Sequence, residues 1–458
     1  MLATQFEEFI NSLQIEDTEE ETKRVKEITK RLNKSYYDDC TSETEHCLVV
    51  GSLGRETAIK TFSDIDMLFI LPSEKKKEYD NCKGNGQSKL LQDVKKEIKK
   101  RYPKTIVRGD GQVVVVSFES LNKVVEVCPV FEKSDGSFTY PDSNNGGTWK
   151  NTNPTPEIDE SISFNNKTDN NFKFACHLVR SWRNNIGFKF GGLLIDTLVW
   201  KFFKENTEYQ TAEFSNYLDI LKDLFQYLKD CNEDQAYWYA LGSNQKVYNK
   251  KCEFVKKAKK AYNKIKDFNE ESSELYDALQ DIFGNTFPIP EEEKNAAAMY
   301  YKSARNYRDT EQFVENKFNV DIRYSLKIDC KVQQNGFRDI SLRNLLKSTI
   351  PRINSHRKLE FFIVENEYEE MLQKSKMDLE FNANNSFDYD IYWKVLNRGE
   401  IAKQKDCIRG QINRDSSHIV ESADFNGEHV VECYIVFKHT VIARDKIKVP
   451  ISISKQYV

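Results

Sequence analysis

The stretch that decides the fold is VVGSLGRETAIKTFSDIDMLFILP, residues 49–72. It places Asp64 and Asp66 two residues apart, at the head of an apolar run that ends at Pro72. Side chains at positions i and i+2 of a strand point to the same face of the sheet. Two carboxylates held side by side repel each other, and this repulsion is tolerable when a divalent cation lies between them. The stretch therefore predicts a buried strand with a metal site at its beginning.

The bulk properties of the chain indicate a multidomain protein with a heavily charged surface. Its 458 residues predict two or three domains, and 39% hydrophobic residues suffice to build their cores. The formal net charge of −4 argues against a global basic field that would attract nucleic acid or anionic lipid. No apolar run approaches the ~20 residues of a membrane helix, and the N-terminus lacks the layout of a signal peptide. The ten cysteines show no CxxC spacing, so we expect them to be reduced thiols. Together with the missing apolar run and signal layout, this predicts a cytoplasmic protein that does not contact a membrane.

The pattern of apolar residues predicts a mixed α/β unit at the N-terminal end. Residues 4–38 show helical spacing over their whole length, which predicts one long helix. Residues 47–52 and 64–72 are predicted strands. An amphipathic helix over residues 85–102 and a hairpin of two Val-rich strands over residues 112–131 follow. Helix and strand alternate, which is typical of a mixed sheet covered by helices.

The rest of the chain divides into a loop, a helical lobe and a β-rich part. Residues 133–156 are rich in Gly, Pro, Asn, Ser and Thr, which predicts a long loop. Helical patterns dominate the chain from there, and strand patterns replace them near its C-terminal third. The predicted domains are a core over residues 1–156, a helical lobe over 157–312 and a β-rich domain over 313–458.

Several side chains near the first predicted strand have a role if the substrate is a nucleoside triphosphate. Gly51 lets the backbone approach phosphate oxygens, and Ser52 adds a hydroxyl donor. Asp64, Asp66 and Glu126, the last on the neighbouring Val-rich strand, supply three carboxylates. Three carboxylates support two Mg²⁺ ions ~3.5–4 Å apart, which activate the attacking hydroxyl and steady the leaving pyrophosphate, with Mn²⁺ as the alternative ion.

Each of these features has an ordinary structural explanation when it occurs alone. A lone Asp-x-Asp pair is frequently a solvated strand edge, and a Gly-Ser pair is weaker evidence still. Glu119 competes with Glu126 for the third position, although its place in the predicted turn 119–122 favours a solvated residue. Only the combination of the pair, the turn and the third acid on one predicted sheet favours a catalytic site.

Residues 51–66, GSLGRETAIKTFSDID, resemble the signature of the bacterial cGAS/DncV-like nucleotidyltransferases, the SMODS or CD-NTase group of the polymerase-β superfamily. The likeness continues through VRGDGQVVVVSF, VVEVCPVF, LVRSWRN and FGNTFP, over roughly residues 1–310. The segment from VDIRYSLKIDCKV to FNGEHVVECYIV resembles the AGS-C domain, a module that is proposed to sense nucleotides. The resemblance implies an α+β fold in which a polymerase-β-type core and a helical lobe precede a β-rich C-terminal domain.

The resemblance also implies an activity and partners. Such enzymes join nucleoside triphosphates, NTP or dNTP, by attack of a 3′-hydroxyl on an α-phosphate with release of pyrophosphate. Many make cyclic di- or trinucleotides that switch on a separately encoded effector in anti-phage defence. A nucleotide ligand of the C-terminal domain is implied as well. Whether the product of this chain is cyclic or linear stays open.

The matching motifs extend the site beyond the three acids. Arg180 stands where the family usually has a Lys two residues before a Trp, and it would contact the triphosphate as a fork. Gln112 would face a nucleobase by family position, and Arg55 flanks the site as a candidate phosphate contact or a helix-surface residue. This chain departs from the family by having Glu126 for the common Asp, and Gly191-Gly192 where a Ser usually follows. The predicted metal ligands are Asp64, Asp66 and Glu126, and the predicted nucleotide contacts are Gly51, Ser52, Arg55, Gln112 and Arg180.

Two other functions remain open from the sequence. Tyr457 near the C-terminus offers a phenol hydroxyl as primer for protein-attached single-stranded DNA, as in Hailong-type relatives. A nucleotide sensor without catalysis is the second alternative, which an intact set of carboxylates disfavours. In the β-rich part, Trp393, Tyr389 and Tyr434 offer rings for base stacking, although packing in the β core is the favoured interpretation.

Overall fold

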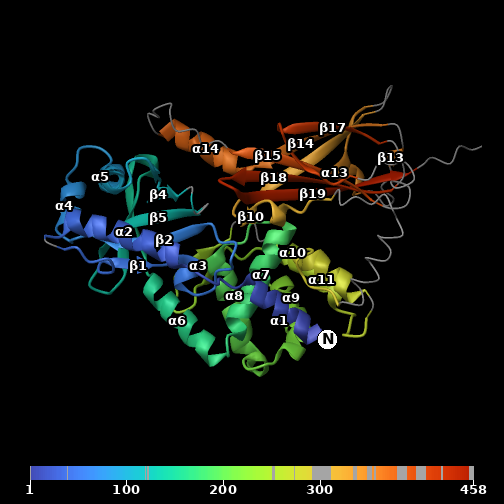
Figure 1. The fold of residues 1–458 in the computed structure, drawn as a ribbon, viewed down its shortest axis with the longest axis horizontal. Helices are drawn as coiled ribbons and strands as arrows, with labels where there is room; N and C mark the ends of the chain where they lie inside the picture. Colours follow the sequence, from blue (N-terminus) through green and yellow to red (C-terminus); the bar gives the residue numbers. More distant parts are fainter. Residues whose placement is uncertain are drawn as a thin grey trace, which may run out of the picture. The chain divides into compact units, whose positions relative to one another are not determined.

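The computed structural model of the chain divides into two compact units (Figure 1). The N-terminal unit comprises Met1–Asn185, Phe190–Pro288 and Met377–Glu380, and the C-terminal unit comprises Ile186–Lys189, Ile289–Lys376 and Phe381–Val458. The predicted boundaries near residues 156 and 312 stay a prediction. The structure describes residues 2–38, 40–118, 120, 123–249, 253–272, 274–290, 311–333, 338–347, 353–354, 357–378, 389–398, 409–423 and 427–452.

The N-terminal unit begins with two helices, α1 (Leu2–Leu13) and α2 (Glu19–Tyr36). The prediction of one helix over residues 4–38 was therefore wrong. The Asp17 carboxylate accepts a hydrogen bond from the backbone N–H of Glu19 at 2.8 Å, and three glutamates occupy the first turn of α2. Acidic side chains stabilise the positive end of a helix dipole, so this charge pattern favours a new helix start over continuation.

The central sheet of this unit has the strand order β1-β2-β5-β4-β3. In addition, β6 pairs with the C-terminal end of β5, and β7 pairs with β6. Strands β2 and β5 run parallel, and the other neighbours are antiparallel. The predicted strand over 64–72 and the hairpin over 112–131 are confirmed. The strands are β1 (Cys47–Val49), β2 (Asp64–Ile70), β3 (Ile106–Asp110), β4 (Val113–Phe118), β5 (Lys123–Glu132), β6 (Phe138–Asp142) and β7 (Thr148–Thr152).

The segment predicted as a long loop, residues 133–156, contains the antiparallel hairpin β6–β7 and the start of a helix. Phe138 is buried there in a small cluster with Leu68 and Val130. Strand β6 also pairs with β5. The loop prediction was wrong because it rested on the many turn-forming residues and did not consider that Phe138 could be buried and hold the hairpin in place.

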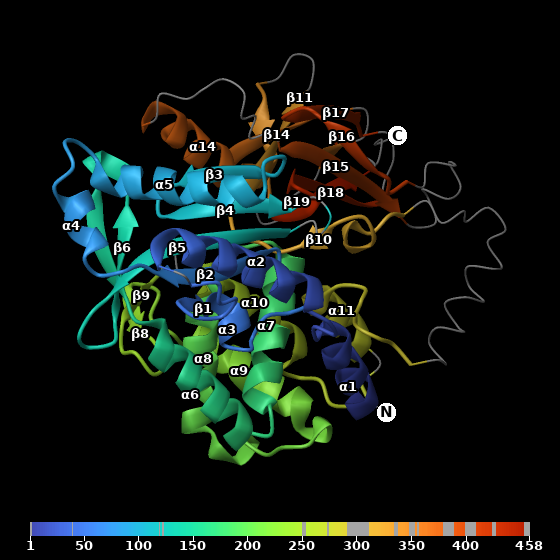
Figure 2. The same cartoon turned by 60° about the vertical axis from the view of Figure 1, so that its left-hand side comes forward.

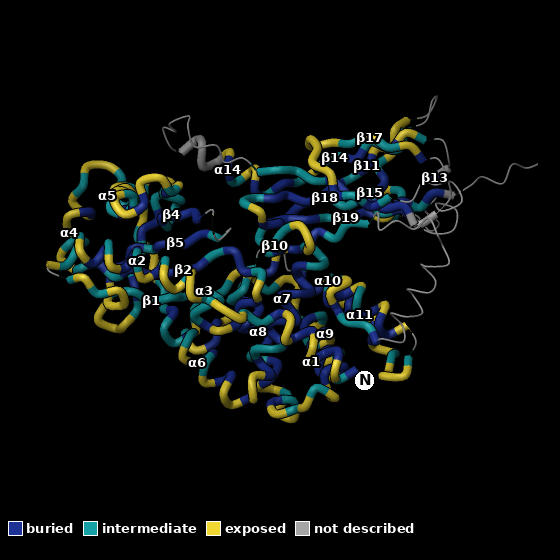
Figure 3. The backbone as a smooth tube through the Cα atoms, viewed as in Figure 1, coloured by how far each residue is buried: buried dark blue, intermediate teal, exposed yellow. Residues whose placement is uncertain are grey.

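One face of the central sheet packs against helices, which determines the direction of the acidic side chains. Ile65, Met67 and Phe69 of β2 are buried in a core that includes residues of α2 and of α5 (Gly86–Arg101). Figure 2 shows both helices beside this sheet. Since side chains alternate along a strand, Asp64 and Asp66 project from the opposite face. Along β2, the positions from Asp64 to Met67 alternate between half-buried and buried, and the next two positions are buried as well. Figure 3 colours the chain by burial and shows buried stretches in this sheet.

The helical part of the N-terminal unit confirms the predicted helical region and adds one hairpin. Strands β8 (Tyr237–Tyr239) and β9 (Lys246–Tyr248) were not predicted. Helix α11 ends at Phe283, followed by Gly284 with a φ of +87°, in the left-handed region that favours glycine. Besides α1, α2 and α5, the helices of the N-terminal unit are α3 (Gly51–Gly54), α4 (Lys75–Asp80), α6 (Pro154–Lys167), α7 (Asn171–Ile186), α8 (Gly192–Glu205), α9 (Tyr217–Lys229), α10 (Glu253–Ile265) and α11 (Leu275–Phe283).

The C-terminal unit contains two sheets that share one hydrophobic core, so the predicted β-rich region is confirmed. The six-stranded sheet has the order β10-β19-β18-β15-β16, with β13 also on β19, and the four-stranded sheet has the order β12-β11-β14-β17. The elements are β10 (Asn319–Val320), β11 (Leu326–Gln333), β12 (Ile340–Ser341), α13 (Leu342–Leu345), β13 (Ile353–Asn354), β14 (Lys358–Asn366), α14 (Glu367–Asp378), β15 (Asp390–Arg398), β16 (Ile412–Asp415), β17 (His418–Ser422), β18 (Gly427–Phe437) and β19 (Thr440–Ser452).

Several smaller predictions are also tested by the structure. Trp393 is 3% exposed and Tyr434 1% exposed, which confirms core packing for these rings. The eight cysteines within the described residues are free thiols. No helix in the described part of the chain combines the length and apolarity needed to span a membrane. Glu119 and Tyr457 lie outside the described residues.

Candidate active site

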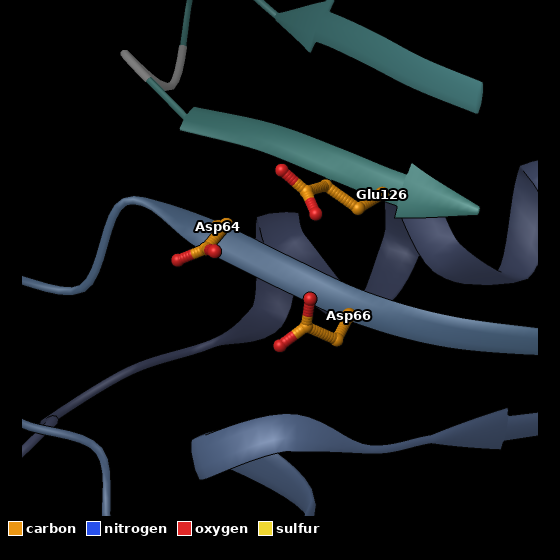
Figure 4. Close-up of side chains that lie close together, drawn as sticks. All are labelled: Asp64, Asp66 and Glu126. Atoms are coloured by element: carbon orange, nitrogen blue, oxygen red, sulfur yellow. The ribbon is translucent and has the colours of Figure 1, made fainter. Parts of the chain in front are cut away.

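The structure brings the three predicted acids together on neighbouring strands. Strand β2 pairs with β5 in parallel, and the register sets Asp66 opposite Glu126 and Asp64 opposite Val124. Asp64 precedes Asp66 by two residues and therefore shares its face of the sheet. One carboxylate oxygen from each acid lies within 4.8 Å of the other two, and all three side chains are half-buried (Figure 4). We call Asp64, Asp66 and Glu126 the acidic face.

Gly51 is required at its position by both its conformation and its neighbour. It begins the short helix α3 with a φ of +68°, in the left-handed region that favours glycine. A Cβ atom at Gly51 would lie 2.0 Å from Oδ2 of Asp66, which is closer than any non-bonded contact allows. The backbone N–H of Val50 donates to the carbonyl oxygen of Asp66 at 2.9 Å. The Gly51-Ser52 turn is thereby held against the acidic face.

A buried ion-pair cluster lies behind this turn. Asp196 on α8 accepts hydrogen bonds at Oδ2 from Nε of Arg55 at 2.9 Å and from the hydroxyl of Thr57 at 2.8 Å. Its Oδ1 pairs with Nη1 of Arg180 at 2.7 Å. We call Arg55, Thr57, Arg180 and Asp196 the Asp196 hub. Burial raises the pKa of Asp196, but the ion pairs with Arg180 and Arg55 outweigh it and lower this pKa to about 2.

The hub also contacts Gly192, one of the two glycines that stand where the family usually has a Ser. Nη2 of Arg180 donates to the Thr57 hydroxyl at 3.1 Å and to the carbonyl oxygen of Gly192 at 3.4 Å. A Cβ atom at Gly192 would lie 3.4 Å from Nη2 of Arg180 and 4.0 Å from Nη2 of Arg55. The two guanidinium groups therefore converge beneath Gly192. Arg55 is 5% exposed, so the alternative of a helix-surface residue was wrong.

Gln112 lies beside a polar cluster next to the sheet. Its side-chain Nε2 donates to Oδ2 of Asp142 at 3.1 Å, and its backbone carbonyl oxygen accepts from the thiol of Cys128 at 3.6 Å. Burial and the nearby charges of Asp66 and Glu126 raise the pKa of the Cys128 thiol. Cys128 is therefore protonated at neutral pH, which removes it as a candidate nucleophile. Contacts of Gln112 and Arg180 with a nucleotide stay predictions.

Sequence reasoning missed Asp196 and Thr57. The available signal was the acid in LLIDTLVWKFF, a helical segment that is otherwise almost entirely apolar. An ionised side chain on a buried helix requires a partner, since burying an isolated charge is costly. That argument predicts a cationic partner for Asp196, but it does not identify Arg55 and Arg180. Their positions follow only from the packing of α3, which is capped by Arg55, and α7, which carries Arg180, against α8.

Two family models match the chain, one at each end. Residues 1–165 match the Second Messenger Oligonucleotide or Dinucleotide Synthetase domain, SMODS. Residues 308–452 match the Adenylyl/Guanylyl and SMODS C-terminal sensor domain, AGS_C. No curated protein matches the chain at a significant level.

Several solved structures are similar to part of this chain, at low sequence identity. E. coli CdnC with ATP is 18% identical with a TM-score of 0.48, covering 63% of this chain and 99% of that chain. Bradyrhizobium diazoefficiens CdnG in complex with GTP is 10% identical with a TM-score of 0.45, covering 62% and 96%. The apo form of Vibrio cholerae DncV is 13% identical with a TM-score of 0.42, covering 63% and 86%.

The two domain matches confirm the resemblance predicted from the sequence. Residues 1–165 are similar to the SMODS synthetase domain, and residues 308–452 are similar to the AGS_C sensor domain. The acidic face lies on β2 and β5, within the residues that the synthetase model covers.

Proposed function

We propose that the acidic face is the active site of a metal-dependent nucleotidyltransferase, which joins nucleotides by attack of a 3′-hydroxyl on an α-phosphate and releases pyrophosphate. The observation that carries this proposal is the convergence of three carboxylates within 4.8 Å of one another. The donor atoms of the acidic face are all hard carboxylate oxygens, which suit Mg²⁺, and Mn²⁺ is the alternative ion. When bound, two such ions supply a lower pKa at the attacking hydroxyl and charge neutralisation at the triphosphate.

The chain's own residues position the triphosphate in this proposal. Gly51 brings the backbone close to the acidic face without a side chain in the way, and Ser52 offers a hydroxyl donor beside it. The Asp196 hub holds two guanidinium groups against one carboxylate, so Arg55 and Arg180 give the region near the turn a positive potential. Such preorganised charge and positioning provide most of the catalysis in phosphoryl-type transfer.

We propose that the product is an oligonucleotide second messenger, cyclic or linear, made in the cytoplasm for anti-phage defence. The match to a second messenger synthetase domain supports this, as does the sensor domain that follows it. The substrates in this proposal are NTPs or dNTPs, and a separately encoded effector responds to the product.

The test is to incubate the full chain with Mg²⁺ and each NTP or dNTP, and to measure pyrophosphate release and product mass. We expect a small free oligonucleotide from the wild-type protein, and resistance to phosphatase would identify it as cyclic. The double variant Asp64→Asn, Asp66→Asn is expected to lower the rate by about 10³-fold or more, because several kcal/mol of charge stabilisation are lost. Glu78→Gln, an exposed helix-surface change, is the matched control. Full activity in the double variant would refute the proposal.

The same experiment separates the two alternatives. Label that stays on the protein and is lost in Tyr457→Phe would show self-primed DNA synthesis rather than a free messenger. Magnesium-independent nucleotide binding with no pyrophosphate release would show a sensor without catalysis.

A further inference from the structure

The central sheet of the N-terminal unit places one arginine in a row with the acidic face. In the parallel pair of β2 and β5, Asp66 is opposite Glu126. In the antiparallel pairs that follow, Glu126 is opposite Val115 of β4, and Val115 is opposite Arg108 of β3. Directly paired residues on neighbouring strands project from the same face of a sheet. These four residues therefore form a row across the sheet, on the face that carries the acids.

The chain neighbours of Arg108 support this direction independently. Val107 is buried in the core that includes residues of α2 and α5. A Cβ atom at Gly109 would lie 3.3 Å from Nε2 of Gln92 on α5, so position 109 faces the helices too. Since side chains alternate along a strand, Arg108 and Asp110 project from the opposite face, where the acids lie.

Arg108 is half-buried and anchored by a neighbouring carboxylate. Its Nη2 donates to Oδ2 of Asp110 at 3.3 Å, and its side chain is 15% exposed. A guanidinium group carries five N–H donors in a planar fork, so it can hold one carboxylate and also bind a phosphate. Partial burial restricts the side chain, and little further ordering is required when an anion binds. Arg108 is thus a preorganised cation on a face that otherwise collects carboxylates.

The phosphate-binding turn of the proposed active site lies on the other side of the acids. The Gly51-Ser52 turn is at the end of β1, which is next to β2 in the order β1-β2-β5-β4-β3. A Cβ atom at Gly51 would lie 2.0 Å from Oδ2 of Asp66, so the turn is close to β2. Arg108 is on β3, at the opposite end of this order. The acids therefore separate the turn from the arginine.

The chemistry of nucleotidyl transfer requires a different nucleotide on each side of the acids. The 3′-oxygen of the acceptor forms a bond to the α-phosphorus of the donor, the bond from that phosphorus to pyrophosphate breaks, and the hydroxyl proton passes to water. The attacking and leaving oxygens are roughly in line. Since the Gly51-Ser52 turn holds the donor triphosphate in the proposed function, the acceptor attacks from the side of β4 and β3.

The spacing of the strands brings the acceptor within reach of Arg108. Two strand spacings, about 10 Å, separate the backbones of Glu126 and Arg108, a separation that the sugar and 5′-phosphate of one nucleotide can bridge. With its 3′-hydroxyl at the acidic face, the acceptor directs its 5′-phosphate towards β3. Val115, which lies between the two residues in the row, adds no charge that would repel or compete for this phosphate.

We propose that Arg108 binds the 5′-phosphate of the acceptor nucleotide, whose 3′-hydroxyl attacks. This inference rests on the proposed function and adds a substrate preference to it. An acceptor with a 5′-phosphate reacts faster than the same nucleoside with a 5′-hydroxyl, because the planar guanidinium pairs with phosphate oxygens through charge-assisted hydrogen bonds.

The test measures transfer to defined acceptors by the full chain with Mg²⁺. The donors are 3′-deoxy- or 2′,3′-dideoxynucleoside triphosphates of all four bases, which lack a 3′-hydroxyl and therefore do not act as acceptors. The acceptors are the nucleosides and their 5′-monophosphates, in ribose and deoxyribose form, and mass spectrometry quantifies the dinucleotide products. We expect kcat/KM to be about 10- to 100-fold higher for at least one 5′-monophosphate than for its nucleoside.

Substitutions of Arg108 test whether this residue causes the preference. In Arg108→Gln, the ratio of kcat/KM between the two acceptors should fall about tenfold or more, because the charge is lost. Arg108→Lys keeps the charge without the planar fork and should restore part of the ratio. The ratio does not depend on the amount of folded enzyme, so a loss of stability does not imitate the effect.

The matched control is Arg31→Gln, which should keep the wild-type ratio. Arg31 on α2 is also half-buried and paired with a carboxylate, that of Glu97 on α5, but these helices cover the other face of the sheet. Equal kcat/KM for both acceptors in the wild-type protein, or an unchanged ratio in Arg108→Gln, would overturn the inference and leave the proposed function standing. No transfer to any of these acceptors would overturn it as well, and no pyrophosphate release from NTPs and dNTPs would overturn the proposed function too.

Discussion

The acidic face and the Asp196 hub are both charged clusters of the N-terminal unit, but they combine charges differently. The hub combines one carboxylate with two guanidinium groups at distances of 2.7 and 2.9 Å. The acidic face brings three carboxylates within 4.8 Å. Opposite charges that pair inside a protein fix local structure, whereas converging like charges favour a bound cation. We therefore expect changes in the hub to alter stability first, and changes in the acidic face to alter activity first.

The largest expected effect on stability is that of Asp196→Asn. This change removes the carboxylate charge and leaves Arg55 and Arg180 buried without it, which costs about 3–5 kcal/mol. Urea unfolding measures the loss. Asp219→Asn, at an exposed position of α9, is the matched control and should change stability by less than about 0.5 kcal/mol. If Asp196→Asn were as stable as the wild-type protein, the hub would not have the structural role given to it.

The pH dependence of unfolding tests the same cluster. The pKa of Asp196 is lowered to about 2 in the folded state, from about 3.9 in an unfolded chain. A lowered pKa means that its stabilisation is present above about pH 4 and is lost as the pH falls towards 2. The expected contribution is about 2–3 kcal/mol. In Asp196→Asn, unfolding free energy should therefore fall less steeply between pH 4 and pH 2. Parallel pH profiles of the two proteins would contradict this.

The next effect is that of Gly51→Ala on activity. The new Cβ would displace the Asp66 carboxylate, and a misplacement of about 1 Å costs about 10²-fold in rate. Gly136→Ala is a matched control, since Gly136 also has a positive φ, of +75°, but a Cβ atom added there would have nothing within 4 Å. Both variants should lose about 1–3 kcal/mol of stability through backbone strain. Only Gly51→Ala should slow pyrophosphate release, and an equal slowing in both variants would refute crowding of the acidic face.

The smallest expected effect is that of Glu126→Asp, which keeps the charge and shortens the side chain by one methylene. Activity should fall about tenfold, since the carboxylate is withdrawn from the acidic face. Glu126→Gln, which removes the charge, should cost about 10²-fold or more. Steady-state rates with Mg²⁺ measure both variants. Unchanged activity in Glu126→Gln would exclude Glu126 as a metal ligand.

The acidic face was predictable from the sequence because it depends on local rules. Alternation along a strand sets Asp64 and Asp66 on one face, and two Val-rich runs around a short turn predict a hairpin. The parallel pairing of β2 with β5 supplies the remaining step, and it sets Glu126 opposite Asp66. The sequence suggested a common sheet but did not determine this register.

The hub and the strand partner of Trp393 could not be predicted in the same way. Asp196 meets Arg55 across 141 positions of the chain, and no local pattern encodes that contact. Trp393 was correctly predicted as a core residue, but its pairing with Asn413 depends on the register of β15 with β16. Long-range packing therefore determines which polar residues meet, even where local patterns determine the elements.

The most direct test of the central claim is to count Mn²⁺ ions bound to the full chain by electron paramagnetic resonance, with a non-hydrolysable triphosphate present. The wild-type protein should bind about two ions saturably, as expected for a two-metal site. The variant Asp64→Asn, Asp66→Asn should lose this binding. Equal stoichiometry and affinity in both proteins would contradict the claim that Asp64, Asp66 and Glu126 hold the metal.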